Sequence, residues 1–204
     1  MSGKAHWENV YNTKGESEVS WFQENPAPSL ELIDLTKATP QSEIVDIGGG
    51  ASRLVDSLVL RGFKNVTVLD LSEAALATAK ERLGVASAGV QWVTADVIKW
   101  YPAQTYDVWH DRAAFHFLTD DMDKAAYVER LNKAVKPDGR VIIGTFALDG
   151  PERCSGLPVN RYNSASLAST LGHNFELIDS RLHDHSTPWG AIQHFQFSTF
   201  QRKI

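Results

Sequence analysis

The stretch that most constrains the fold is EIVDIGGGASRLVDSL, residues 43–58. A short apolar run leads into three consecutive glycines, and a helical pattern follows at once. A glycine-rich turn between a buried strand and a helix usually holds a nucleotide, because glycine lets the backbone approach the ligand closely. The stretch therefore predicts a strand–turn–helix unit with a nucleotide or nucleoside at the turn.

Short apolar runs alternate with helical patterns from Ile44 onward. Strands are predicted at residues 43–48, 65–71, 90–96, 106–111 and 140–146, and helices at 51–62, 72–84 and 123–135, with Ser72 and Gly84 as caps and KPDG as the turn before the last strand. This alternation indicates right-handed crossovers and a mostly parallel sheet covered on both faces. Residues 174–186 and 191–203, joined by TPWG, are typical of a C-terminal antiparallel hairpin.

The first 40 residues contain no obvious strand. We expect a helix at 29–38, and a helix followed by a loop at 7–26 that covers the sheet. A length of 204 residues fits one domain with a single well-buried core. The prediction is one domain over 1–204, with an N-terminal cap at 1–40 and the α/β core at 41–204.

Composition limits the partners and the compartment. The net charge is −5 and there is no run of Lys and Arg, which does not favour nucleic acid but leaves structured RNA open. Cys154 is the single cysteine, so an internal disulfide is impossible and a reducing compartment is favoured. The N-terminus lacks the apolar core of a signal peptide, and no apolar run approaches the ~20 residues that span a bilayer. We expect a cytoplasmic protein, monomer or homodimer, without a DNA or membrane partner.

The glycines match the dinucleotide fingerprint Gly-x-Gly-x-x-Gly only in part. Gly48 and Gly50 occupy the first two positions, but the third falls on Arg53. The third glycine allows close packing of helix on strand in NAD-binding folds, so Arg53 argues against NAD. Asp46, just ahead of the turn, is an unfavourable neighbour for a pyrophosphate.

Acidic residues follow two further strands. Asp70 ends the second strand, 20 residues after Gly50, which is the distance at which a carboxylate reaches ribose hydroxyls. Its two oxygens can accept from both the 2′ and the 3′ hydroxyl. Asp96 ends the third strand, where a carboxylate can accept from an adenine amine with Val97 beside the ring. Ligands of open α/β sheets bind at these strand ends, so an adenosine ligand is indicated.

These segments resemble the motifs of class I S-adenosylmethionine-dependent methyltransferases. VDIGGGASRL resembles the first motif, VTVLDLS the second, VTADV the third and YDVWHDRAAFHFL the fourth, and the similarity extends over residues 44–147. The resemblance implies a Rossmann-like three-layer sandwich whose sheet has seven strands, with only the last-inserted one antiparallel. It also implies S-adenosylmethionine as the cofactor, bound by Tyr11, Trp21, Asp46, Gly48, Gly50, Asp70, Leu71, Asp96, Val97 and Asp111.

The cofactor that the resemblance implies suits these residues chemically. It has no phosphates and carries a sulfonium and an ammonium, so acidic groups such as Asp46 and Asp111 are favourable neighbours. Asp46 can also hold the shape of the turn. Trp7 and Tyr11 are four residues apart on one helix face, and with Trp21 they can close over the cofactor or pin the cap to the core.

Two features bear on the acceptor. The fourth motif lacks the Asn/Asp-Pro-Pro-aromatic run of amino-methylating DNA and glutamine enzymes, and has HDRAAF in its place. The early WENVY and the SWF segment resemble the cap of small thiopurine-type and tellurite-type methyltransferases, and also the opening of some protein-lysine methyltransferases.

Candidate bases lie on or just after the fourth strand. We predict His116 and Asp111 as catalytic residues, for an acceptor that arrives protonated, with His110 as a further candidate. Asp111 can instead pair with Arg112, and Arg112 can bind an acidic substrate. Cys154 is given no catalytic role, because methyl transfer needs no covalent intermediate. His183 and His185 lack further ligands, so no metal site is predicted.

The sequence therefore predicts a methyltransferase that uses S-adenosylmethionine and acts on a small-molecule acceptor, because the chain is short and has a compact cap. The alternative is a protein-lysine methyltransferase. A non-enzymatic adenosine-binding module stays open, and an NAD-dependent oxidoreductase is weakened by Arg53.

Overall fold

The structure is a computed structural model that describes residues 3–204. Its elements, in chain order, are α1 (Lys4–Thr13), η1 (Glu16–Glu18), α2 (Ala27–Leu35), β1 (Glu43–Ile47), α3 (Leu54–Leu60), β2 (Asn65–Asp70), α4 (Glu73–Leu83), η2 (Gly84–Gly89), β3 (Val90–Thr94), β4 (Tyr106–Arg112), η3 (Phe115–Phe117), α5 (Asp121–Ala134), β5 (Val135–Phe146), β6 (Arg153–Cys154), β7 (Leu157–Pro158), α6 (Ser164–Leu171), β8 (Phe175–Ser186) and β9 (Ile192–Arg202).

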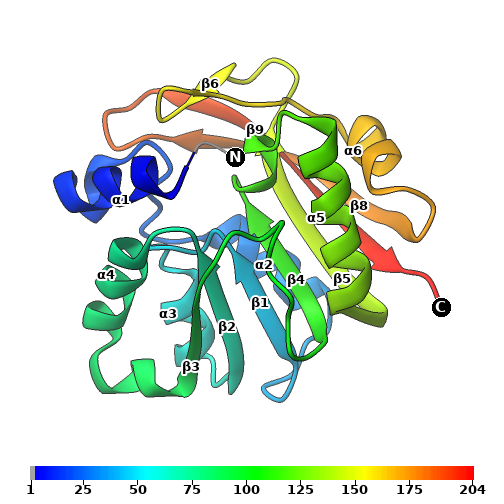
Figure 1. The fold of residues 1–204 in the computed structure, drawn as a ribbon, viewed down its shortest axis with the longest axis horizontal. Coiled ribbons are helices and arrows are strands. Elements are labelled where there is room, and N and C mark those ends of the chain that lie inside the picture. The colour runs from blue at the N-terminus through cyan, green and yellow to red at the C-terminus, as the bar shows by residue number, and fades with distance from the viewer. Residues whose placement is uncertain (1–2) are drawn as a thin grey trace.

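Seven strands form one sheet in the order β3-β2-β1-β4-β5-β9-β8. The pairs among β1 to β5 are parallel, and β9 runs antiparallel to both of its neighbours. The predicted α/β class, the seven-stranded sheet and the C-terminal hairpin are confirmed. Since the parallel strands run the same way, the carboxyl ends of β1, β2 and β4 meet at one edge of the sheet (Figure 1).

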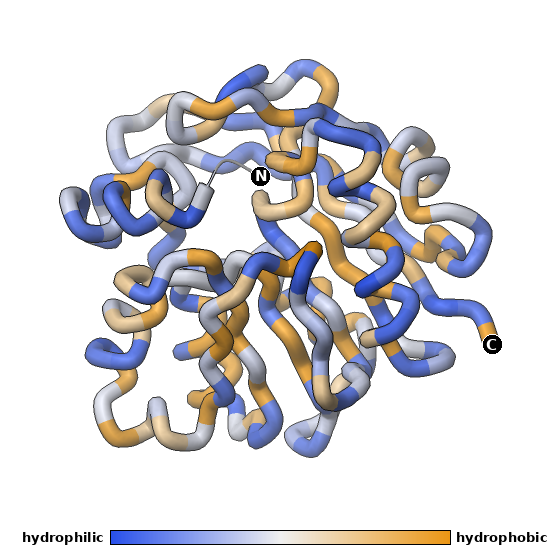
Figure 2. Tube along the Cα trace, in the orientation of Figure 1, coloured by the Kyte–Doolittle hydropathy of each residue, from blue (hydrophilic) through white to orange (hydrophobic). Residues whose placement is uncertain are grey.

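Helices cover both faces of the sheet. On one face, α5 and α6 contribute Tyr127, Leu131, Leu167 and Leu171 to a buried core (Figure 1). On the other face, α2, α3 and α4 contribute a second core, which contains Leu30, Ile33, Leu54, Leu58 and Leu76. The central strands are accordingly apolar along much of their length (Figure 2). Among residues 3–204, no helix combines the length and apolarity that crossing a bilayer requires.

Local signals place most helix ends where expected. The Ser72 hydroxyl accepts from the Ala75 N–H at 3.1 Å and caps α4, which ends at Gly84 with a φ of 56°. The helix expected at 51–62 begins only at Leu54, because the Ser52 N–H donates to the Gly49 carbonyl and residues 51–53 continue the turn.

The segments after α5 differ from the expectation. The KPDG turn lies inside β5, since Tyr106 pairs with Val135 and the register then shifts to pair Val108 with Arg140. Asp138 adopts the left-handed φ of 61° within this irregular part of the strand. The helix α6 and the short β6–β7 hairpin were not predicted.

We predict that Gly49→Ala destabilises the fold by about 1–3 kcal/mol, because a Cβ there would lie 2.5 Å from Asp46 Oδ2 and 2.7 Å from Val68 Cγ1. Urea unfolding monitored by circular dichroism measures this change. Gly89→Ala is the matched control, since a Cβ at Gly89 meets nothing within 4 Å. Equal stability of the two variants would show that the turn has more room than the structure gives it.

Candidate active site

Two adjacent cavities lie where the carboxyl ends of the strands meet the N-terminal segment. The first is lined by Trp7, Tyr11, Trp21, Ile47, Gly48, Leu69, Asp70, Leu71, Ala95, Val97, Arg112, Ala113, Ala114, Phe117 and Cys154. The second is lined by Tyr11, Glu16, Val19, Trp21, Phe22, Gln23, Pro26, Ser29, Asp46, Gly48, Gly49, Ala51, Ser52, Arg53, His110 and Arg112. Tyr11, Trp21, Gly48 and Arg112 line both, so the two cavities are neighbours that share a wall.

The glycine turn brings three strand ends into close contact. Gly48 and Gly50 have φ values of 66° and 44°, which L side chains rarely adopt. A Cβ on Gly48 would lie 2.7 Å from the Ala114 Cβ, after β4, and one on Gly50 would lie 2.8 Å from Asp70 Oδ2, at the end of β2. The backbone therefore leaves a cradle at the turn that any side chain would fill.

Asp70 is the acidic group at the floor of the first cavity. The residue is 7% exposed, and its Oδ1 accepts from the Ser72 N–H at 2.8 Å. Burial, together with the nearby charges of Asp46 and Glu8, raises the pKa of Asp70 to about 7. Leu71 lines the same cavity. A carboxylate in this position, with few internal donors, suits two hydroxyl groups of a bound ribose.

Asp46, His110 and Ser29 form a buried chain of hydrogen bonds beneath the turn, which we call the relay. Asp46 Oδ1 lies 2.7 Å from His110 Nδ1, and His110 Nε2 lies 2.8 Å from the Ser29 hydroxyl of α2. All three residues are buried and line the second cavity. The relay orients the Asp46 carboxylate and occupies both ring nitrogens of His110, and the role of His110 as a base stays a prediction. Ser29 was missed by the sequence analysis, since nothing in α2 marks it.

Residues that follow β3 form one side of the first cavity. Ala95 and Val97 line it, and Asp96 lies between them. Asp96 Oδ1 accepts from the Ile98 N–H at 3.3 Å, which turns the chain after β3. The ligand role predicted for Asp96 stays a prediction.

Asp111 is fully buried at the end of β4 and lines neither cavity. Its carboxylate accepts from the N–H groups of Ala114 and Phe115, each at 3.0 Å, and from the Tyr127 hydroxyl at 2.8 Å. Burial raises the pKa of Asp111 to about 6, although these hydrogen bonds lower it. The expected pair with Arg112 is wrong, because Arg112 donates to the Trp21 carbonyl instead. Asp111 thus shapes the turn after β4, and its predicted catalytic and cofactor roles stay predictions.

His116 is also fully buried and lines neither cavity. Its ring packs against Phe117 and Phe146, and neither nitrogen has a partner among residues 3–204. Burial and the nearby Arg112 lower its pKa to about 3, so the imidazole is neutral near neutral pH. In this arrangement, His116 does not reach the cavity, and its catalytic role stays a prediction.

The N-terminal segment forms the remaining wall. Trp21 Nε1 donates to the Tyr11 hydroxyl at 3.1 Å, and Trp7 packs edge-on against Trp21 and Phe117. Glu8, which lies on α1 with Trp7 and Tyr11, accepts from the Glu73 and Ala74 N–H groups at the start of α4. A carboxylate is favoured at a helix N-terminus, so Glu8 fastens α1 to the core. This contact was not predicted because it joins segments far apart in the chain.

Cys154 lines the first cavity from β6. Burial raises the pKa of its thiol to about 12, so it stays protonated near neutral pH. Among the described residues, no group of three or more His, Cys, Asp or Glu side chains is arranged to hold a metal ion.

Comparison with known proteins shows what the chain resembles. Residues 44–139 match the family described as "Methyltransferase domain". The chain is 28% identical over 126 residues to a malonyl-[acyl-carrier protein] O-methyltransferase of Ilyobacter polytropus, which covers 61% of this chain and 45% of that protein. It is 22% identical over 140 residues to the eEF1A lysine and N-terminal methyltransferase of Mus musculus, which covers 67% of this chain and 19% of that protein. The chain thus spans less than half the length of either relative.

Solved structures share the fold. One is the 1,6-didemethyltoxoflavin-N1-methyltransferase of Burkholderia thailandensis, determined with 1,6-didemethyltoxoflavin and S-adenosylhomocysteine. It superposes with a TM-score of 0.70 at 21% identity, over 98% of this chain and 84% of that one. The match to a methyltransferase domain and the shared fold agree with the resemblance to class I methyltransferases.

We predict that S-adenosylhomocysteine binds more weakly as the pH falls below about 7. Below that pH, Asp70 is protonated in the free protein, so binding that requires the ionised carboxylate must release a proton, and affinity falls by up to about tenfold per pH unit. Calorimetric titrations between about pH 5.5 and 8.5 measure this change in affinity. Asp70→Asn should bind at least about tenfold more weakly with a flat pH profile, and Asp34→Asn, outside the site, should match the wild type. A wild-type affinity independent of pH would contradict the role of Asp70.

We predict that Glu8→Gln lowers the affinity for S-adenosylhomocysteine by about two- to fivefold, because the neutral amide holds the N-terminus of α4 less well and loosens Trp7 and Tyr11. Burial raises the pKa of Glu8, but the hydrogen bonds from the Glu73 N–H, the Ala74 N–H and the Ser72 hydroxyl outweigh it, so the pKa is lowered. The carboxylate therefore keeps this contact above the usual pKa of a glutamate and loses it in acid. Calorimetry and limited proteolysis of residues 14–26 measure the two effects. Glu81→Gln, exposed on α4, is the control. If Glu8→Gln resists proteolysis as the wild type does, Glu8 does not fasten α1.

Proposed function

We propose that this chain, whose residues 44–139 match a methyltransferase domain, is a class I S-adenosylmethionine-dependent methyltransferase and methylates a small-molecule acceptor in the first cavity. The observation that carries the proposal is the position of Asp70. Its buried carboxylate lies against Gly50, in a turn that has no room for a side chain, so the polar group nearest to this glycine is acidic. A phosphate-free, positively charged nucleoside suits these groups better than a dinucleotide does.

The cofactor-binding residues divide the site between them. With the cofactor bound, Asp70 would accept from the ribose hydroxyls, and Ala95 and Val97, which line the same cavity, would contact the adenine. Gly48 and the Asp46–His110–Ser29 relay lie towards the amino-acid end, where an oriented carboxylate favours an ammonium. When bound, S-adenosylmethionine supplies the methyl group and the sulfide leaving group.

The chain contributes alignment and exclusion of water. Trp7, Trp21 and Phe117 enclose the cavity from the N-terminal segment and η3, and holding two reactants in line can lower the barrier by roughly 7–11 kcal/mol. Among the described residues that line this cavity, none is a free general base, since Asp70 is assigned to the ribose and Cys154 is a neutral thiol. An acceptor atom that arrives with an available lone pair fits this lining best.

A small acceptor is supported by the enclosed, aromatic lining of the cavity. The alternative, a protein-lysine methyltransferase, is supported by the mouse relative, whose name gives a lysine acceptor, and by the N-terminal WENVY and SWF segments. The cytoplasmic location, the monomeric or homodimeric state and the absence of a DNA partner stay predictions from the sequence.

Methyl transfer from radiolabelled S-adenosylmethionine into a lysate tests the proposal. We predict label in the small-molecule fraction, with none after Asp70→Ala. Label confined to protein bands would support the lysine alternative. Cofactor binding without transfer to either fraction would contradict an enzymatic role and favour a sensing module.

A further inference from the structure

Arg112 is the cation at the centre of the site. It follows the buried part of β4, and it lines both cavities together with Tyr11, Trp21 and Gly48. The guanidinium carbon lies 5.1 Å from the centre of the Phe195 ring on β9. Its head group therefore sits between the N-terminal segment and the C-terminal hairpin.

One edge of the guanidinium has no partner. Nη1 donates to the Trp21 carbonyl oxygen at 2.9 Å. Nε and Nη2 are buried, and neither has a hydrogen-bond partner among residues 3–204. These two nitrogens lie on the same side of the planar group, and their N–H bonds run parallel, as in the fork that binds both oxygens of a carboxylate.

The charge of Arg112 also has no carboxylate in direct contact with it, although the more distant charge of Asp46 favours its protonated form. Within the described part of the chain, no carboxylate lies within 4.0 Å of its nitrogens, and the nearby Asp111 is occupied by Ala114, Phe115 and Tyr127. Burial lowers its pKa to about 10, so it stays positive near neutral pH. Buried donors of a charged group are costly to leave unpaired, so this edge is expected to meet an anion in the working complex.

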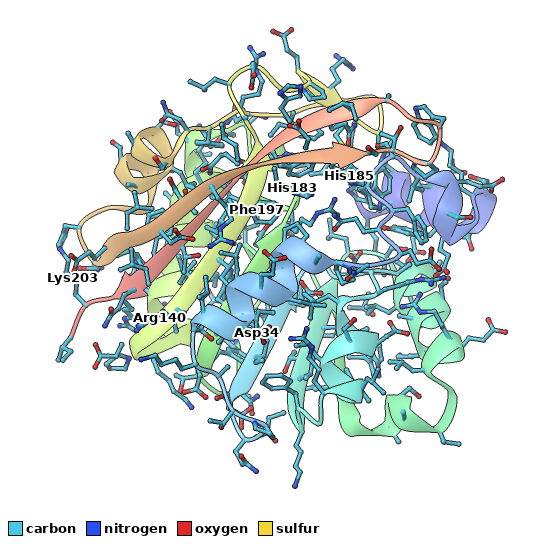
Figure 3. The ribbon with its side chains drawn as sticks, turned by 180° about the vertical axis from the view of Figure 1, so that it is seen from behind. Asp34, Arg140, His183, His185, Phe197 and Lys203 are labelled. Atoms are coloured by element: carbon cyan, nitrogen blue, oxygen red, sulfur yellow. The ribbon has the colours of Figure 1, made fainter. Side chains whose placement is uncertain are left out.

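The surroundings of Arg112 place that anion on the hairpin side of the site. Cys154 and Phe195 lie beside the guanidinium, and its charge helps to lower the pKa values of His183 and His185, whose burial is the larger cause. Figure 3 shows these two histidines on β8, above α2 and close to Phe197. Asp70 and Val97, which mark the adenosine end, come from the opposite part of the sheet, β2 and the segment after β3.

We propose that Arg112 recognises a carboxylate on the methyl acceptor, through a two-pronged contact from Nε and Nη2. The inference rests on the proposed function and narrows it to carboxylic acids. Because Trp7 and Phe117 line the same cavity, the acid carries an apolar portion. The carboxylate of the cofactor itself is the other chemical source of such a group, and the experiment separates the two.

The test uses protein saturated with S-adenosylhomocysteine and titrated with hexanoate or 4-phenylbutyrate, each beside its primary amide. The wild type should bind the acids at least about tenfold more tightly than the amides. Arg112→Gln should abolish this preference, and Arg112→Lys should reduce it, since a lysine keeps the charge but loses the fork. Arg61→Gln, exposed and far from the cavities, should retain it. Equal binding of acids and amides by the wild type, or an unchanged preference in Arg112→Gln, overturns the inference.

A second pair of titrations identifies the source of the carboxylate. S-adenosylhomocysteine and 5′-methylthioadenosine, which lacks the amino-acid portion, should each bind Arg112→Gln within about fivefold of the wild type, and any loss should be the same for both because it comes from the lost contact with the Trp21 carbonyl. A loss of about tenfold for the first ligand alone would assign Arg112 to the cofactor carboxylate and overturn the inference. Failure of the wild type to bind either ligand would refute the proposed function itself. Thermal unfolding curves of both variants show whether they fold. If Arg112→Gln does not fold, Arg112→Lys still tests the proposal.

Discussion

The site depends on the absence of side chains in the turn after β1. A Cβ on any of the three glycines would lie within 3.0 Å of another group: the Ala114 Cβ, Asp46 Oδ2 and Asp70 Oδ2, respectively. The turn therefore draws together the ends of β1, β2 and β4 and leaves bare backbone facing the cavity. Close packing of this kind leaves little tolerance for added atoms.

The N-terminal segment completes this site through contacts across the chain. Glu8 binds the start of α4, the Trp21 carbonyl accepts from Arg112, and the Ser20 carbonyl accepts from His185 Nε2 at 2.7 Å. The segment is thus fastened to a helix, to the sheet and to the C-terminal hairpin. Its aromatic residues form a wall of the cavity because these three anchors hold them there.

Features that follow from local sequence were predictable. The strand–glycine–helix unit, the Ser72 cap and the position of Asp70 at the end of β2 depend on neighbours within a few residues. The surroundings of buried polar groups were not predictable, because their partners are distant in the chain. Asp111 looked like a partner for Arg112, but Tyr127, 16 residues away, donates to it. His116 was predicted as a catalytic residue, but it is buried and its ring packs against Phe117 and Phe146. The irregular start of β5 depends likewise on pairing with Tyr106.

A crystal structure with S-adenosylhomocysteine tests the central claim most directly. The account predicts both ribose hydroxyls within hydrogen-bond distance of the Asp70 carboxylate, about 2.5–3.0 Å, and the adenine against Val97. The amino-acid portion should follow Gly48 towards the Asp46 relay. A ligand that leaves Asp70 without a hydroxyl partner, or that binds outside the cavity beneath Trp7 and Tyr11, would contradict it.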